Sequence, residues 1–210
     1  MRYLELYNKL NLMGEKEYIE NLLVFNLSQV LAGIKPASTI AIKRNKENSY
    51  DKWHKYGIDF VKSLNLDFVE LRKSNDGMVL MIYDPEVLKD YIFNKEAKSF
   101  LIKLGYCYKE DVELYVNKLR DRYKLFNCPH ELGLFLGIPI KDVEDFMTCT
   151  SKKCLFCGYW KVYNDCDKAM KTFKKYDEVK VSTIDKILKG SDSRELALNI
   201  KNFEKKHIQV

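Results

Sequence analysis

The 210-residue sequence has few of the residues that interrupt a folded chain. It contains four prolines and nine glycines, and it shows no Gly/Ser-rich linker, low-complexity tract or internal repeat. Hydrophobic residues make up 46% and charged residues 31% of the chain, which allows a buried core and excludes a disordered protein. We therefore expect a single domain over residues 1–210. A sub-boundary near residue 125 would separate an N-terminal α+β part from a C-terminal helical part.

A secretory signal and a membrane-spanning segment are also lacking. The first residues do not combine a basic start with an apolar run. The most apolar stretch, residues 22–34, is interrupted by Asn26, Ser28 and Gln29. We expect a cytoplasmic protein without membrane association. Its six cysteines would then be reduced thiols, metal ligands or redox groups rather than structural disulfides.

The net charge of +6 is compatible with an anionic ligand or with nucleic acid. Residues 127–147 have the rhythm of a helix-turn-helix motif. However, the second helix would carry Asp142, Glu144 and Asp145 beside a single Lys141, and DNA phosphates would repel these carboxylates. We interpret the segment as a packed helical hairpin and do not expect nucleic acid as a partner.

Hydrophobic periodicity predicts the fold class. Apolar residues recur at helical spacing over 15–32, and strands are expected near 38–43, 67–72 and 78–83, the last two joined by a tight turn at 74–77. Later helices are expected near 86–93, 95–104, 109–123, 129–136, 140–147, 165–176, 184–189 and 192–204. Strands early and helices late predict an α+β fold: a small, mainly antiparallel sheet packed by many helices, with an all-helical C-terminal half.

Two segments carry polar residues beside glycine or proline. Lys35 follows a helix end and precedes a strand, where it could contact a ligand or simply belong to a rigid turn. His130 and Glu131 follow Pro129 at a helix start, and they are candidate catalytic residues that could hold an anion or carry a proton. In the alternative, Glu131 complements the helix dipole and His130 packs locally.

Four cysteines lie within eighteen residues, as Cys149-x4-Cys154-x2-Cys157-x8-Cys166. The Cys-x2-Cys spacing suits two ligands of one metal ion, and nearby lysines could make Cys154 or Cys157 a reactive thiol. Cys157 is thus also a candidate catalytic residue. A structural zinc site would show a second close pair, which is missing, so ordinary half-buried cysteines are a third alternative.

An aromatic run follows the cysteines. Trp160, Lys161 and Tyr163 could line a pocket for a flat or anionic ligand. In the alternative, the run wedges one element against the core, and Asp165 caps the next helix.

Several of these stretches resemble one family. They are LAGIKPAS (31–38), PHELGLFLGIP (129–139), Asp142-Val143 with Phe146, and CGYWKVY (157–163). The resemblance spans roughly residues 15–185 and is to uncharacterised proteins of anaerobic bacteria that form a domain of unknown function. It implies no established activity. It does imply a role in iron or redox physiology, since such genes lie near those for ferrous-iron uptake and flavodoxins. The family pattern centres on Cys157 and leaves out the other cysteines.

These observations lead to three hypotheses. The first is a protein that binds a small molecule, or more narrowly an anion, or an enzyme acting on one. Its pocket would form where the stretches near residues 35, 130 and 160 converge. The second is a metal or thiol-redox protein that uses Cys154 and Cys157, assisted by Cys128, Cys149 or Cys166. The third is an interaction module whose lysine-rich helices recognise an acidic redox protein. The sequence identifies no cofactor and leaves open whether the protein is an enzyme.

Overall fold

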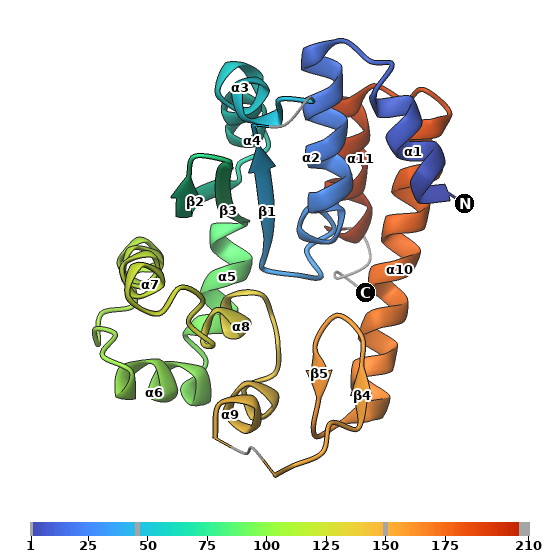
Figure 1. The fold of residues 1–210 in the computed structure, drawn as a ribbon. Coiled ribbons are helices and arrows are strands. Elements are labelled where there is room, and N and C mark those ends of the chain that lie inside the picture. Colours follow the sequence, from blue (N-terminus) through green and yellow to red (C-terminus); the bar gives the residue numbers. More distant parts are fainter. Residues whose placement is uncertain (1, 45–46, 149–150, 206–210) are drawn as a thin grey trace.

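Figure 1 shows the computed structural model of the protein, which describes residues 2–44, 47–148 and 151–205, with side chains through residue 202. The elements are, in order, α1 (Arg2–Leu10), α2 (Glu15–Leu31), β1 (Ala37–Lys43), α3 (Ser49–Lys52), the π-helix η1 (Trp53–Gly57), α4 (Ile58–Ser63), β2 (Asp67–Ser74), β3 (Gly77–Tyr83), α5 (Pro85–Ile92), α6 (Lys95–Lys103), α7 (Val112–Phe126), α8 (Leu132–Phe135), α9 (Ile140–Thr148), β4 (Phe156–Cys157), β5 (Lys161–Val162), α10 (Cys166–Leu188) and α11 (Ser193–Lys205).

The three long strands form an antiparallel sheet in the order β1-β3-β2. The tight turn between β2 and β3 lies where the sequence predicts it. Gly77, which follows the turn, has a φ of +145°, and a Cβ there would lie 2.1 Å from the carbonyl oxygen of Ile42. Only glycine allows β1 to approach this closely. The apolar sequence of β3 predicts a central strand, and this is confirmed.

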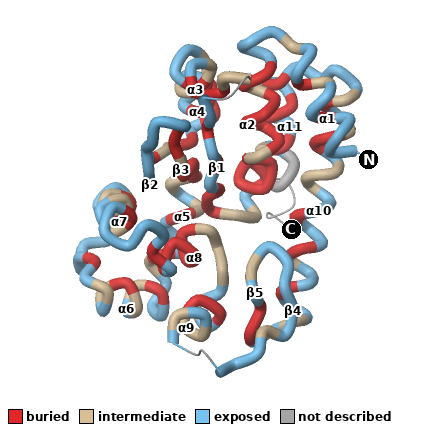
Figure 2. Tube along the Cα trace, in the orientation of Figure 1, coloured by how far each residue is buried: buried red, intermediate tan, exposed pale blue. Residues whose placement is uncertain are grey.

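Each face of the sheet packs against helices, because side chains alternate between the two faces along a strand. Leu80 and Ile42 lie in one hydrophobic core with α2, α4 and α11. Met81 and Val69 lie in a second core with α5, α7 and α8. Figure 2 shows the buried positions along β3 and α2. The sheet is therefore the middle layer of three, and the predicted α+β fold class is confirmed.

Helix-capping signals in the sequence also act as expected. The Asp84 carboxylate accepts hydrogen bonds from the backbone N–H groups of Glu86 and Val87, at 3.1 and 3.3 Å, and so starts α5. Asp165 accepts one from the N–H of Lys168 at 2.9 Å and starts α10. These caps satisfy donors that the first turn of a helix leaves unpaired.

The C-terminal half is mostly helical, but it also contains the short antiparallel hairpin β4–β5, which the sequence analysis did not predict. Strands of two residues are too short to show an alternating pattern. The two helices expected at 165–176 and 184–189 are one continuous helix, α10. The short helix α1 was also missed. It is held by Leu6 and Leu10, both fully buried. None of the described helices is long and apolar enough to cross a membrane.

Shortening a side chain of the central strand should destabilise the whole protein. Leu80→Ala removes a fully enclosed side chain from the core of α2, α4 and α11, and we expect the free energy of unfolding to fall by about 2–5 kcal/mol. Urea unfolding followed by circular dichroism measures this change. As the control, Leu12→Ala alters a side chain that is 88% exposed and should change the value by no more than about 0.5 kcal/mol. Equal effects of the two variants would contradict this account of the core.

Candidate functional site

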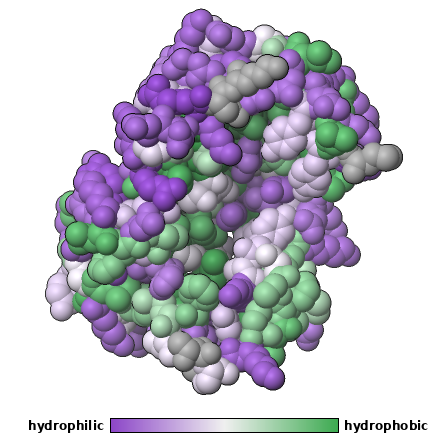
Figure 3. Space-filling view, in the orientation of Figure 1, coloured by the Kyte–Doolittle hydropathy of each residue, from purple (hydrophilic) through white to green (hydrophobic). Residues whose placement is uncertain are grey.

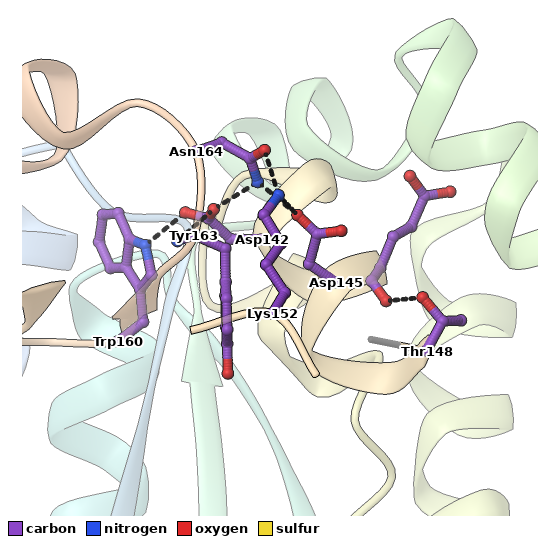
Figure 4. Close-up of polar contacts among 8 residues, drawn as sticks. Asp142, Asp145, Thr148, Lys152, Trp160, Tyr163 and Asn164 are labelled. Atoms are coloured by element: carbon purple, nitrogen blue, oxygen red, sulfur yellow. Dashed lines mark hydrogen bonds and ion pairs between the residues drawn. The ribbon is translucent and has the colours of Figure 1, made fainter. Parts of the chain in front are cut away.

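The hairpin β4–β5 is attached to α9 through one buried carboxylate (Figure 4). Asp142, which is 3% exposed, accepts hydrogen bonds from the indole N–H of Trp160 at 2.9 Å and from the backbone N–H of Tyr163 at 3.0 Å. The side-chain amide of Asn164 donates a third, at 2.9 Å. Three donors replace the water that a carboxylate loses on burial, so Asp142 holds residues 160–164 in one place.

The sequence alone marks Asp142 only as a negative charge that opposes DNA binding. Its role as an acceptor was missed because the three donors lie 18 to 22 residues further along the chain. The available signal was that Asp142 and the Trp160 segment both belong to the stretches that carry the family resemblance. A second network supports the same contact, since the Asp145 carboxylate accepts from both Asn164 and Lys152.

The aromatic residues of the hairpin pack on α10. The ring of Trp160 meets that of Phe173 edge to face at a centroid distance of 4.4 Å, and Tyr159 meets Tyr176 at 5.0 Å. A Cβ on Gly158 would lie 2.3 Å from the Phe173 ring, so this approach requires glycine. Tyr163 is only 8% exposed. The aromatic residues 159–163 therefore pack the hairpin against α10. Trp160 also faces an open space.

That space is a groove of about 750 Å³ between the hairpin, α10, α5, α6 and the turn that joins α8 to α9. Figure 3 shows this face of the molecule hollowed beside the hairpin. The wall combines aromatic and apolar side chains with a few polar groups, which is the composition of many small-molecule sites. The lining residues are Tyr91, Asn94, Glu96, Ala97, Leu134, Gly137, Ile138, Pro139, Ile140, Lys141, Asp142, Trp160, Asn164, Asp165, Lys168, Ala169, Thr172 and Tyr176.

Lys35 lies next to this groove. The neighbouring Pro36 packs so closely on Gly137 that a Cβ there would lie 2.8 Å from its ring, and the Lys35 ammonium is 5.9 Å from the ring centroid of Tyr176. Within the described residues this ammonium forms no hydrogen bond or ion pair. Burial, with a smaller contribution from the charge of Lys180, lowers the pKa of Lys35 to about 8.

The structure places His130 and Glu131 outside the groove lining. His130 is exposed, and its ring meets Phe146 edge to face at 5.0 Å, while the ammonium of Lys161 lies 5.6 Å from the same Phe146 ring. Glu131 is 1% exposed and pairs with Arg122, and it also accepts from the Tyr106 hydroxyl at 3.3 Å. The Glu131 contact raises the pKa of Arg122. Of the predicted ligand-binding residues, Trp160 lines the groove, and the Lys35 ammonium lies beside the lining residue Tyr176.

The candidate metal residues separate in a similar way. The sulfur atoms of Cys154 and Cys157 are 3.3 Å apart, and Cys166 lies at the start of α10. Cys149 falls outside the described residues. Across residues 2–44, 47–148 and 151–202, no three His, Cys, Asp or Glu side chains form a group that could hold a metal ion. Among the described residues, Cys154 and Cys157 therefore have no third such side chain close enough to complete a metal site.

Removing the acceptor of the hairpin contacts should loosen the groove wall. Asp142→Ala leaves three donors without their partner, and we expect the free energy of unfolding to fall by about 2–4 kcal/mol. Acrylamide quenching of Trp160 should also increase, measured in a Trp53→Phe background because the chain has only two tryptophans. Glu144→Ala is the matched control on the same helix, since no described residue pairs with its carboxylate. Unchanged quenching in Asp142→Ala would contradict the role of Asp142.

Comparison with known proteins gives a family but no activity. The chain matches the family described as "Protein of unknown function (DUF3793)" over residues 23–197. No curated protein and no solved structure matches it. The resemblance that the four motifs indicate is thereby confirmed, and the groove is lined by residues from three of those motifs: 129–139, Asp142 and 157–163. Because the match extends over most of the sequence, the chain belongs to the DUF3793 family.

Proposed function

We propose that this protein is a cytosolic binding protein for a small organic anion with a flat part, held in the groove beside Trp160. The observation that carries the proposal is the half-buried Lys35 ammonium, which has no counter-ion among the described side chains and lies next to an aromatic wall. Burying an unpaired charge is unfavourable, so such a group is usually neutralised, paired or used to hold a ligand.

The lining holds three carboxylates and two lysines, and it is the pairing of these groups that favours an anion over a cation. Asp142 is already satisfied by three donors, and Asp165 accepts from the first turn of α10. These two carboxylates therefore attract a cation less than free ones would. Lys141 and Lys168 add positive charge among the lining residues, and Glu96 is the remaining carboxylate there. An anionic group near Lys35 would meet an ammonium that no described side chain pairs with.

The wall of the groove supports a ligand with a flat or apolar part. Trp160 is held by Asp142 and Phe173, so its ring is already ordered before a ligand arrives. Tyr91, Tyr176 and Ile138 offer further apolar surface. An aromatic or heterocyclic ring could stack here while a carboxylate or phosphate reaches toward Lys35, and an ordered wall reduces the entropy lost on binding.

Binding is favoured over acid–base catalysis by the positions of the two predicted catalytic residues. His130 packs against Phe146, and the Glu131 carboxylate is paired with Arg122. Neither is among the groove residues, and the described lining contains no histidine or cysteine. The family resemblance implies a role in iron or redox physiology. That role stays a prediction.

The test follows the fluorescence of Trp160 in the Trp53→Phe background during titration with phosphate, citrate, benzoate and adenosine monophosphate. We expect an aromatic anion to bind more tightly than phosphate. Lys35→Met should weaken that binding about tenfold or more, because a charge-assisted contact is worth about 1.5–3 kcal/mol. Lys16→Met is the control, since that side chain is 68% exposed on α2. Equal affinities for an anion in the two lysine variants would refute the proposal.

The lowered pKa of Lys35 gives a second prediction. At pH 7 the folded protein carries a buried ammonium, so Lys35→Met should increase the free energy of unfolding by about 1–3 kcal/mol. The unfolded chain holds the Lys35 proton more tightly, so wild-type stability rises between pH 8 and the usual lysine value, and the advantage of the variant shrinks there. Anion affinity should fall as pH rises through about 8. Urea unfolding at pH 7 and pH 10 measures the stability change, and a destabilised variant at pH 7 would contradict it.

A further inference from the structure

The hairpin brings two thiols together on the surface. The Sγ atoms of Cys154 and Cys157 are 3.3 Å apart, Cys157 is exposed and Cys154 is half-buried. The backbone bond from Leu155 N–H to the carbonyl oxygen of Val162, at 2.8 Å, and the pairing of Cys157 with Lys161 hold the two strands. This geometry is set by the hairpin and does not depend on the groove.

The distance distinguishes between two uses of the pair. A disulfide has an S–S bond of about 2.05 Å, so its formation requires the sulfurs to approach by a little over 1 Å. A metal ion would need further ligands, and none is within reach among the described side chains. Leu155 and Phe156, which lie between the two cysteines, are exposed, so an incoming molecule can reach the thiols.

From this arrangement we propose that Cys154 and Cys157 form a dithiol–disulfide couple that exchanges with a disulfide substrate. The more exposed Cys157, as thiolate, attacks one sulfur of the substrate and releases the other as a thiol. Cys154 then gives up its proton and attacks the Cys157 sulfur of the mixed disulfide. The bond between Cys157 and the substrate sulfur breaks, and the second substrate thiol is released. The protein dithiol is oxidised to a disulfide, and one substrate disulfide is reduced to two thiols.

The surroundings of the pair determine its reactivity. The hydrogen bond with Cys154 raises the pKa of Cys157, and the charge of Lys161 acts in the opposite direction. The Cys154 thiol also donates to the carbonyl oxygen of Phe156 at 2.9 Å. Cys157 is therefore mostly protonated at neutral pH, and it reacts more slowly than a thiol of depressed pKa.

The experiment incubates the reduced full-length chain with glutathione disulfide, quenches with acid, alkylates the free thiols and maps the peptides by mass spectrometry. We expect a Cys154–Cys157 disulfide to form before any other and to release two glutathione molecules per protein. In Cys154→Ser the mixed disulfide of Cys157 with glutathione should accumulate. Cys166→Ser is the control and should behave as the wild type. Circular dichroism of each variant verifies that it is folded.

Three results would overturn the proposal. One is that glutathione disulfide leaves Cys154 and Cys157 free. Another is that a different cysteine pair is oxidised first. The third is stoichiometric zinc or iron in protein purified without chelators, lost in both Cys154→Ser and Cys157→Ser, because the pair would then be a metal site.

Discussion

The candidate site depends on the buried carboxylate of Asp142. Its three hydrogen bonds hold residues 160–164 against the start of α9, although seven residues, 149–155, separate α9 from β4 along the chain. Without this acceptor, two-residue strands would have little to stabilise them, since an isolated hairpin is marginal in water. The carboxylate thus converts a short, weak element into the fixed wall of a groove.

The region of the groove combines an ordered aromatic ring with a charged lysine, and the half-buried charge lowers the stability of the protein. Phe173 and Asp142 fix Trp160 from two sides, while Lys35 stays charged beside Tyr176 without a described counter-ion. A protein selected only for stability would replace such a lysine with an apolar residue of similar size. Its presence next to an ordered aromatic wall is the physical reason to connect this region with a ligand.

The sequence predicts the parts of the fold that repeat a regular pattern. The period of apolar residues in α2 and the turn before Gly77 were sufficient to place the central helix and the antiparallel sheet. Capping residues such as Asp84 marked helix starts correctly. The hairpin β4–β5 was missed because Phe156 and Cys157 form too short a strand to show a period, and its position depends on a distant aspartate.

The site was predictable only in part, for the same reason. Lys35 and Trp160 stand out as polar or aromatic residues in unusual stretches; Trp160 lines the groove, and Lys35 lies beside the lining residue Tyr176. The sequence could not show that Glu131 pairs with Arg122 or that His130 packs on Phe146, because these contacts join the turn before α8 to two other helices, α7 and α9. Side-chain partners across elements follow from tertiary packing, which a single sequence does not display.

The regions that stabilise the protein and those that carry the proposed functions are largely separate. The two cores on the faces of the sheet contain Leu80 and Met81, whereas Val162 and Phe173 form a small cluster of their own beneath the hairpin. Local opening of a surface hairpin requires less free energy than global unfolding. Changes at Trp160 or at the two thiols should therefore alter ligand or redox behaviour while the three-layer sheet and helices stay folded.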